Sequence, residues 1–500
     1  MEAVAHKPGH LTMGFLGLAA ALSAVSLVAV NDRPADSGYA LVCLVPLVVG
    51  VFSFLACTRP LVTLLLALIF ITSPIRLALS LTQSATVSAF LLGACVVGFG
   101  ARSGWRSLLR DSILRDPTLR DPMIAPIGIF AAYGIASAAY GLWLGNPLSY
   151  IMGDCFQALE FAAVYFLVAQ LLASEADVRL LLRSLLISML IMVGAQLALF
   201  VLGPAAGSLL PSWVGGSAAE ELVRTIDIDA TILFTVLINL YPLARSRRQR
   251  YWIWAALIPT VANIALSLSR GLWVCTLVAG IASLVLQGGK TRARLLRASA
   301  YVGICVVLLA AGWKIGSGGG DSLMDVFQER IFHGVDQIEE GFAGTESMAT
   351  RRFLEMAIVE PQVLDRPWFG HGLGASYIIA GFAVLDAGTT GLIDHHFMHN
   401  LYLATAFRMG LVGLALLLWV LTRYFRQILK AYKKMPPDFR KAIVAGLLAS
   451  IVGQLFLSIT EPTLVDHPTC ALIGAAMAVS FRLVRTPQPN NPRMDLSHGV

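Results

Sequence analysis

The residues best suited to chemistry stand where a polar segment of the chain gives way to an apolar one. His399 and Asn400 end a polar stretch that starts at Asp394, and a hydrophobic run begins directly after them. An imidazole exchanges protons near neutral pH and therefore suits a general base. A helix start adds unpaired backbone N–H groups and the positive end of the helix dipole, which favour a neutral ring and nearby anions. The pair predicts proton-transfer chemistry at the boundary between water and lipid.

Metal chemistry is the main alternative for individual residues. His395 and His399 have the i,i+4 spacing of zinc ligands on a helix, but a zinc-protease helix has Glu where this chain has His396. Asp227 and Asp229 could form a metal-binding pair, yet at the start of an apolar run they are more simply a helix cap or first-turn acids. The chain has no Walker sequence and no Gly-rich nucleotide loop after a strand. The sequence therefore predicts no metal and no nucleotide cofactor.

The composition indicates an integral membrane protein. Of the 500 residues, 57% are hydrophobic and 13% are charged, and the mean hydropathy is +0.74, whereas soluble domains carry about 25% charged residues. The seven cysteines stand in or at the ends of apolar segments and indicate no disulfide framework. The net charge of +7 does not predict nucleic-acid binding, because the basic residues fall in short loops between apolar runs.

Apolar runs bounded by polar residues predict an all-α fold with about fourteen transmembrane helices. The first run is long enough to cross a bilayer, and it is interpreted as a retained helix because no small-residue cleavage site follows it. The predicted spans are residues 11–30, 38–56, 60–80, 83–100, 123–143, 154–173, 180–202, 227–244, 252–269, 271–287, 298–316, 399–422, 442–460 and 468–484.

Basic residues predict the orientation of these helices. Alternate loops are rich in Lys and Arg, and the intervening loops have almost none. The positive-inside rule assigns the basic loops to the cytoplasm. With fourteen spans, all the basic loops and both termini fall on that side. The polar segment 317–398 then faces the periplasm or the cell exterior.

The segment 317–398 is a large extramembrane loop with a mainly acidic character. It carries twelve Asp and Glu residues against four arginines. The pattern predicts a helix over 347–359 with Ser347 as its N-cap. Turn-rich backbone is expected from Pro361 through Gly374. Trp368 and Phe369 suit either stacking on a sugar ring or a position at the membrane interface.

Several motifs, in order along the chain, resemble one protein family. His399-Asn400 followed by Gly410 and Gly413 gives a His-Asn-x9-Gly-x-x-Gly pattern. Upstream, the segment 367–374 (Pro-Trp-Phe-Gly-His-Gly-Leu-Gly) follows an arginine pair, and a Ser-Arg-Gly junction precedes both. Over about residues 220–420 these features resemble the O-antigen ligase and O-antigen polymerase family.

The resemblance implies a membrane glycosyltransferase. Members move a glycan from a polyprenyl diphosphate lipid to an acceptor hydroxyl at the outer face of the inner membrane, with inversion and without a metal. His399 would then be the general base, and Asn400 would orient its ring or a sugar hydroxyl. The departing diphosphate needs fixed positive charge, which arginine supplies through paired hydrogen bonds. The expected clamps are Arg224, Arg270, Arg351 and Arg352.

Local explanations for these arginines stay open. Arg351 has the i,i+4 spacing of a helical ion pair with Glu355. Arg270 lies between two predicted spans and could snorkel to the interface. Gly410 and Gly413 are interpreted as sites of close helix packing.

The chain is expected to divide into four parts. N-terminal transmembrane helices occupy 1–220, and a ligase-like catalytic region with the loop 317–398 occupies 221–422. Further transmembrane helices fill 423–485, and a disordered tail follows over 486–500. Expected partners are a polyprenyl-diphosphate-linked glycan donor, a glycan or lipid A core acceptor and membrane lipids, with no nucleic acid.

Two other functions stay open at this point. A flippase for lipid-linked oligosaccharides, or another polysaccharide transporter, would have a similar number of spans. Transporters usually show repeated halves with polar sites at the membrane midplane, and no internal repeat is evident here. The second is a non-catalytic partner in a polysaccharide export complex.

Overall fold

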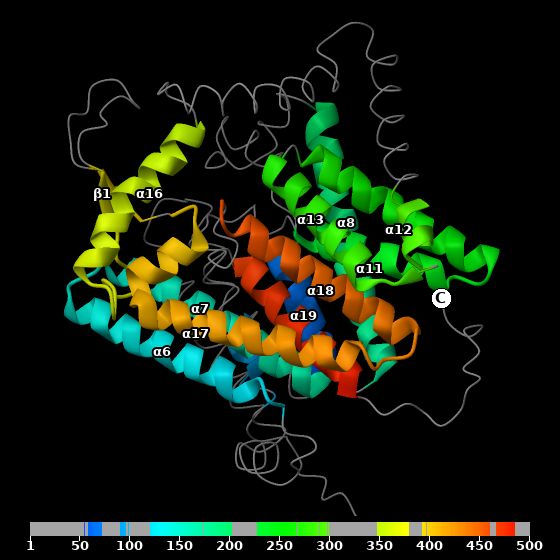
Figure 1. Ribbon diagram of the computed structural model, residues 1–500, viewed down its shortest axis with the longest axis horizontal. Helices are drawn as coiled ribbons and strands as arrows, with labels where there is room; N and C mark the ends of the chain where they lie inside the picture. Colours follow the sequence, from blue (N-terminus) through cyan, green and yellow to red (C-terminus); the bar gives the residue numbers. More distant parts are fainter. Residues whose placement is uncertain are drawn as a thin grey trace, which may run out of the picture.

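The computed structural model is built almost entirely from helices (Figure 1). It describes residues 55, 59–72, 91–96, 99, 121–172, 174–202, 228–267, 269–289, 291–297, 299, 348–379, 393–396, 398–460 and 467–485. The helices are α3 (Pro60–Thr72), α6 (Ile124–Trp143), α7 (Leu148–Leu171), α8 (Glu175–Leu202), α11 (Ile228–Leu240), the 3-10 helix η4 (Tyr241–Leu243), α12 (Arg247–Leu266), α13 (Arg270–Leu286), α16 (Met348–Asp365), α17 (Leu401–Tyr432), α18 (Phe439–Leu457) and α19 (His467–Arg485). Two short strands, β1 (Tyr377–Ile379) and β2 (Ile393–His395), lie between α16 and α17.

Within this described part, four helices are long and apolar enough to cross a membrane, namely α6, α7, α17 and α18. Shorter apolar helices cover Pro60–Ile69, Asp229–Leu243 and Gly271–Leu286. Some predicted spans agree closely with the helices, as for 123–143 with α6 and 468–484 with α19, whereas α17 continues to Tyr432, well beyond the predicted span 399–422. The span 11–30, and nearly all of 38–56 and 298–316, lie outside the described residues, so the number fourteen stays a prediction.

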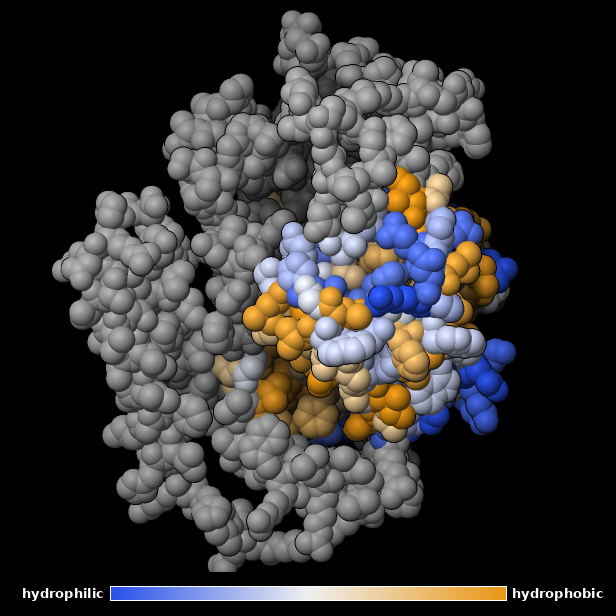
Figure 2. Space-filling view, turned by 90° about the vertical axis from the view of Figure 1, so that its left-hand side faces the viewer, coloured by the Kyte–Doolittle hydropathy of each residue, from blue (hydrophilic) through white to orange (hydrophobic). Residues whose placement is uncertain are grey.

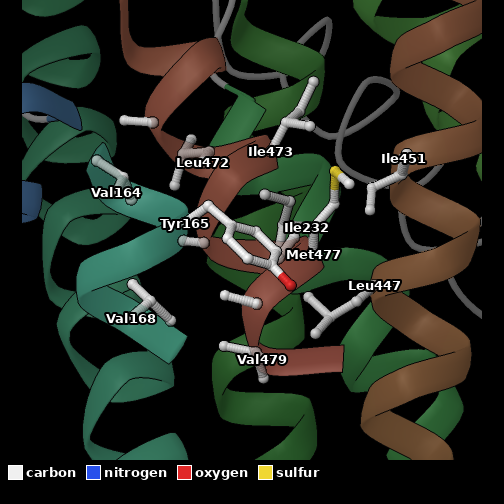
Figure 3. Packing of buried hydrophobic residues seen from close by; sticks show 14 of the residues in the cluster. Val164, Tyr165, Val168, Ile232, Leu447, Ile451, Leu472, Ile473, Met477 and Val479 are labelled. Atoms are coloured by element: carbon white, nitrogen blue, oxygen red, sulfur yellow. The ribbon is translucent and has the colours of Figure 1, made fainter. Parts of the chain in front are cut away.

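The core lies where α7, α11, α18 and α19 meet. Tyr165 of α7 is buried in a region that also holds Ile232 of α11, Leu447 of α18 and Leu472 of α19 (Figure 3). Its hydroxyl donates to Oδ2 of Asp121 over 2.6 Å. The ring thus contributes a large apolar surface while its one polar atom is satisfied.

Glycines let α18 approach its neighbours closely. A Cβ at Gly446 would lie 2.6 Å from the Cα of Val236 in α11. A Cβ at Gly453 would lie 2.6 Å from the carbonyl oxygen of Cys275 in α13. Small residues at such positions are a common means of packing helices tightly in membranes.

These contacts fix the directions of three helices. The hydroxyls of Thr231 in α11 and Thr276 in α13 are hydrogen-bonded over 3.2 Å, and Asn239 in α11 donates to Ser283 in α13 over 3.0 Å, so the two helices run parallel. Helix α18 runs the opposite way, because its first glycine meets the second half of α11 and its second glycine meets the beginning of α13. The starts of α11 and α13 and the end of α18 therefore share one end of the bundle, which we call the site end.

Helix α17 also starts at the site end. The backbone N–H of Leu401, its first residue, donates to the carbonyl oxygen of Ser458, directly after α18, over 3.0 Å. Basic residues mark the far end of the same helix pair, with Arg423, Arg426, Lys430, Lys433 and Lys434 in and after α17 and Arg440 and Lys441 at the start of α18. The basic ends of these two helices are thus opposite the site end.

Helix α17 is broken at Gly410. This residue has φ 68° and ψ −177°, a conformation open to glycine and costly for other residues. A Cβ at this position would collide with the carbonyl oxygen of Trp368, so the break is also the place where a preceding loop meets the helix. Figure 1 shows the short first segment of α17 turned away from the long one.

Helix α16 is longer than the predicted helix over 347–359. It continues through Pro361 to Asp365, so the turn-rich backbone begins after Asp365, and the prediction of turns from Pro361 is wrong. A proline inside a helix removes one hydrogen bond, but Val359 and Val363 are buried in a cluster with residues of α17, which holds the last turns. The strands β1 and β2 pair antiparallel with Tyr377 opposite His395, a small addition to the predicted all-α fold.

Candidate active site

One carboxylate holds His399 at two points. Oε2 of Glu355, on α16, lies 2.6 Å from Nδ1 of His399, and Oε1 accepts the backbone N–H of the same residue over 2.7 Å. The Glu355 side chain is 8% exposed and the His399 side chain is 34% exposed. A buried carboxylate therefore holds a ring that reaches the accessible surface.

Asn400 starts helix α17. Its Oδ1 accepts the backbone N–H of Leu403 over 3.0 Å, the contact of an N-cap residue. Its Nδ2 points to the Sδ of Met356 at 3.9 Å. These contacts of the side chain go to the helix and to α16, and through the helix start they help to fix the neighbouring His399.

Tyr377 of β1 is a buried phenol that senses the charges of Glu355 and Arg408. Its side chain is buried, with 1% of the residue exposed. Burial raises the pKa of its phenol, and the Glu355 carboxylate raises it further, while Arg408 offsets part of the change. The phenol therefore stays protonated at neutral pH.

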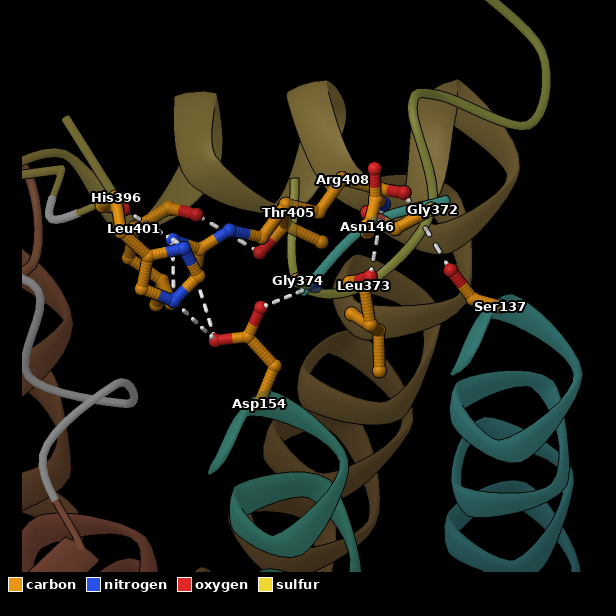
Figure 4. Close-up of polar contacts among 10 residues, drawn as sticks. All are labelled: Ser137, Asn146, Asp154, Gly372, Leu373, Gly374, His396, Leu401, Thr405 and Arg408. Atoms are coloured by element: carbon orange, nitrogen blue, oxygen red, sulfur yellow. Dashed lines mark hydrogen bonds and ion pairs between the residues drawn. The ribbon is translucent and has the colours of Figure 1, made fainter. Parts of the chain in front are cut away.

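A second cluster is built on a buried ion pair (Figure 4). Arg408 Nη1 donates to Oδ1 of Asp154 over 2.9 Å, and both side chains are 5% exposed. The backbone N–H of Gly374 donates to the other oxygen of Asp154 over 2.8 Å. His396 Nε2 lies 3.3 Å from Asp154 Oδ1, its carbonyl accepts from the Arg408 guanidinium, and its ring stacks on Tyr150 with centroids 4.1 Å apart.

This cluster joins elements that are far apart in the sequence. Asp154 belongs to α7, Arg408 to the first segment of α17, and Gly374 to the loop before β1. A buried ion pair that loses one partner leaves an uncompensated charge, so the pair ties the three elements together. Each oxygen of Asp154 already has a partner, so the ion pair is suited to a structural role.

A pocket of about 80 Å³ opens beside the ion pair. Helices α7 and α17 both start near the ion pair, so Asp154 and Arg408 line the pocket close to their starts. Phe161, Leu417 and Leu421 line it further along the same helices. The pocket is thus polar at one end and apolar along its length, which suits part of an amphipathic molecule.

The loop 367–374 provides hydrogen-bond partners for backbone groups at the break in α17. The backbone N–H of Leu411 donates to the carbonyl of Pro367 over 2.7 Å, and the backbone N–H of His371 donates to the carbonyl of Phe407 over 2.8 Å. These are backbone groups that the break removes from the helix ladder. In a membrane they must find partners inside the protein.

Helix α6 supplies further partners at the break. The hydroxyl of Tyr133 donates to the carbonyl of Met409 over 2.9 Å, and the hydroxyl of Ser137 lies 3.4 Å from the carbonyl of Arg408. The break is therefore held from two sides, by a loop and by a transmembrane helix. These contacts hold the first segment of α17, which follows His399 and Asn400 and carries Arg408.

Glycines allow the loop to sit this close. Gly370 and Gly372 have φ of 68° and 78°. A Cβ at Gly370 would lie 2.5 Å from the carbonyl oxygen of Phe407, and one at Gly372 would collide with Gly141 of α6. The Pro-x-x-Gly-x-Gly pattern is thus explained by docking of the loop against α6 and α17.

The structure places three of the four predicted arginines by their backbone. Arg351 and Arg352 lie in α16, four and three residues before Glu355, which is the spacing of one helix face. Arg270 is the first residue of α13 and so lies at the site end. The side chains of these three residues, and all of Arg224, lie outside the described part of the chain, so the four clamp roles stay predictions.

The zinc alternative on a helix is not supported. His395 belongs to β2 and His399 precedes α17, so the two do not share a helix turn. Among the residues that the structure describes, no three His, Cys, Asp or Glu side chains are grouped as metal ligands would be. Asp229 is buried in the first turn of α11, as its interpretation as a first-turn acid predicts, and Asp227 lies outside the described residues.

Sequence reasoning missed Asp154, Arg408 and the partnership of Glu355 with His399. A signal for Asp154 and Arg408 exists, because ionisable residues inside apolar spans usually mark an internal or functional site. The spacing of Glu355 suggests only a helical partner for Arg351. Its contact with His399 crosses 44 residues of sequence, so no local pattern points to it.

The surface at the site end is mixed in character. Figure 2 faces the end that carries α16 and β1, and it shows hydrophilic side chains gathered beside hydrophobic ones. Trp368 and Phe369, in the loop 367–374, are 66% and 61% exposed. Exposed aromatic side chains beside a polar surface are typical of the membrane interface.

Comparison with known families identifies the central part of the chain. Residues 255–418 match the family described as O-Antigen ligase. The matched region runs from α12 into α17 and includes Glu355 and His399. Among curated proteins, none matches the chain. The family resemblance of the sequence motifs is confirmed by this match.

Proposed function

We propose, because residues 255–418 match the O-antigen ligase family, that the protein is a glycosyltransferase of the bacterial inner membrane. It transfers an oligosaccharide or polysaccharide from a polyprenyl diphosphate carrier to an acceptor hydroxyl at the periplasmic face. The acceptor is either another lipid-linked glycan or the lipid A core. The observation that carries the proposal is the position of His399, the motif histidine, at the start of a membrane-length helix.

His399 acts as the general base in this proposal. Its ring is half-buried and held by Glu355, and it stands directly before the N-cap of α17. The acceptor hydroxyl gives its proton to the ring as its oxygen attacks the anomeric carbon of the donor sugar. The bond from that carbon to the diphosphate breaks at the same time, and its electron pair leaves with the diphosphate oxygen. A single displacement of this kind inverts the anomeric configuration and requires no metal.

The charge of the departing diphosphate is met by helix starts and arginines. Helices α11, α13 and α17 all begin at the site end, and helix N-termini stabilise anions. Arg270 begins α13, and Arg351 and Arg352 precede Glu355 by about one turn of α16. Arg224 precedes the first residue of α11 by four positions in the sequence. These four arginines are the proposed clamp for the diphosphate and the attached glycan.

The distribution of charge supports a periplasmic position for the site. The basic ends of α17 and α18 lie opposite the site end. Basic segments next to membrane helices remain in the cytoplasm. The site end, with the loop residues that surround His399, is therefore assigned to the periplasmic side, and both termini to the cytoplasm.

The test is transfer activity of His399→Ala in proteoliposomes that contain the purified full-length protein, a polyprenyl diphosphate glycan and an acceptor. Loss of a general base lowers the rate by about 10²–10⁴-fold. The variant must insert at the wild-type level, which limited proteolysis from one side of the vesicle measures. Transfer at the wild-type rate by a normally inserted His399→Ala protein contradicts the assigned base.

Gel profiles of glycans from a deletion strain separate the two acceptor classes. Single-repeat glycans indicate a polymerase, and long chains left on the carrier lipid indicate a ligase. Movement of the donor across sealed vesicles without any glycan transfer contradicts the proposal and favours a flippase.

A further inference from the structure

Glu355 and His399 form a contact that is more specific than an ordinary ion pair. The two oxygens of the carboxylate reach two different donors of one residue, the ring Nδ1 at 2.6 Å and the backbone N–H at 2.7 Å. The carboxylate is buried while the ring is one-third exposed. Such an arrangement fixes the rotation of the ring as well as its distance from the carboxylate.

We propose that Glu355 is a positioning residue, which holds His399 in the tautomer with the proton on Nδ1 and the basic lone pair on Nε2. This inference rests on the proposed function in taking His399 as the base. An ionised carboxylate accepts hydrogen bonds and donates none, so the ring must donate through Nδ1. A neutral imidazole carries one proton, and Nε2 is then the nitrogen that takes the proton of the acceptor hydroxyl.

The same contact supports the ring after proton transfer. Once Nε2 has taken the proton, the imidazolium carries a full charge next to the Glu355 carboxylate. The attraction between the two stabilises the charged ring, and the carboxylate stays ionised throughout. The proton ends on Nε2, and Glu355 neither gains nor loses one.

Helix α16 holds Glu355 in place by packing. Glu355, Val359 and Val363 follow one another at intervals of four residues, so they share one face of the helix. All three are buried, and the two valines join a hydrophobic cluster with Ala404 and Phe407 of α17. The carboxylate and the start of α17 are therefore parts of one packed unit, as a positioned catalytic pair requires.

The experiment compares three variants of the full-length protein in proteoliposomes. Glu355→Gln keeps the size of the side chain and its oxygen acceptor, but its amide group donates to Nδ1 and so reverses the tautomer. Glu355→Asp keeps the carboxylate on a shorter side chain. Glu360→Gln, on the exposed side of the same helix, is the matched control. Histidine ¹⁵N NMR of labelled protein reports which ring nitrogen carries the proton, and the spectrum of His399→Gln assigns the signal among nine histidines.

We expect Glu355→Gln to lower kcat by about 10²-fold or more, with the KM for the donor unchanged within about a factor of two. Glu355→Asp recovers part of kcat, and Glu360→Gln behaves as the wild type. In the NMR spectrum the His399 proton moves from Nδ1 to Nε2 in Glu355→Gln.

Two results separate failure of this inference from failure of the proposed function. A wild-type His399 protonated on Nε2, or a tautomer that is the same in Glu355→Gln, overturns the inference. A tautomer that follows Glu355 while His399→Ala still transfers glycan at the wild-type rate supports the positioning contact and overturns the proposed function. A kcat for Glu355→Gln equal to that of Glu360→Gln also overturns the inference.

Discussion

His396 and His399 stand three residues apart, and each contacts one carboxylate, yet their surroundings differ. His396 shares Asp154 with the buried Arg408 and stacks on Tyr150. His399 has a carboxylate that contacts its ring and its own backbone, and its side chain is more exposed, at 34% against 23%. The carboxylate next to His396 is already neutralised by an arginine, and the ring is covered by a stacked tyrosine, so His396 is suited to a structural role. One beside a dedicated carboxylate at an accessible helix start is suited to exchange a proton.

The largest expected effect on stability is in the buried cluster. Arg408→Met leaves the Asp154 carboxylate buried without its cation, which is expected to lower the free energy of unfolding by about 3–5 kcal/mol. Unfolding in detergent micelles, followed by circular dichroism with increasing denaturant, measures the change. The exposed Arg366 directly after α16 offers a matched control, and Arg366→Met is expected to stay within about 0.5 kcal/mol of the wild type.

A double variant sharpens this result. Asp154→Asn combined with Arg408→Met removes both charges and is expected to be more stable than Arg408→Met alone. Equal stabilities of the single and double variants would show that the two side chains do not act as a pair.

The break at Gly410 affects the positions of both histidines, because His396 and His399 lie close to the first segment of α17. Gly410→Ala forces a positive φ on a residue with a Cβ and brings that Cβ against the Trp368 carbonyl. The expected loss is about 1–3 kcal/mol in the free energy of unfolding. Transfer activity is expected to fall as well, since the segment between His399 and the break has to shift.

Gly280 provides the control for this prediction. It lies inside α13, and a Cβ added there would have nothing within 4 Å, so Gly280→Ala is expected to be neutral or to stabilise the helix by up to about 1 kcal/mol. If Gly410→Ala and Gly280→Ala unfold at the same denaturant concentration, the break is not strained in the way described.

The smallest effect is expected at His396. His396→Ala removes the ring that stacks on Tyr150, while the backbone carbonyl that accepts from Arg408 remains. The loss should be about 0.5–1.5 kcal/mol in the free energy of unfolding. Transfer by the folded fraction should change far less than in His399→Ala. A larger loss of transfer in His396→Ala than in His399→Ala would reverse the comparison between the two histidines.

Helix positions were largely predictable, because apolar runs bounded by polar residues have a direct physical meaning in a membrane. The run over 271–287 corresponds to α13, and Ser269 before it is the N-cap, with its side chain accepting the N–H of Leu272. The break at Gly410 was not predictable in the same way. A glycine inside an apolar run is also compatible with an unbroken helix, and the carbonyls that make the break tolerable belong to a loop some 40 residues earlier.

The site residues show the same difference between what neighbouring residues predict and what long-range packing determines. His399 was identifiable because its type, its neighbour Asn400 and the helix start are adjacent in the sequence. Its partner Glu355 was not, because a contact over 44 residues depends on how α16 packs against α17. The family resemblance predicts that Asn400 orients a ring or a sugar hydroxyl, and this role stays a prediction, while the structure adds that its side-chain oxygen caps α17. The neighbouring sequence indicates what chemistry a residue can perform, whereas the packing of the helices determines which groups that residue contacts.

The way the broken helix is held also bears on the order in which the chain can assemble. Tyr133 and Ser137 enter the bilayer with α6, whereas the carbonyls they bind lie 276 and 271 residues later in the chain. Those hydroxyls have to use temporary partners until the last third of the protein has been synthesised. The first segment of α17 can settle only after α6 is already in place, so the surroundings of His399 are among the last parts of the molecule to be completed.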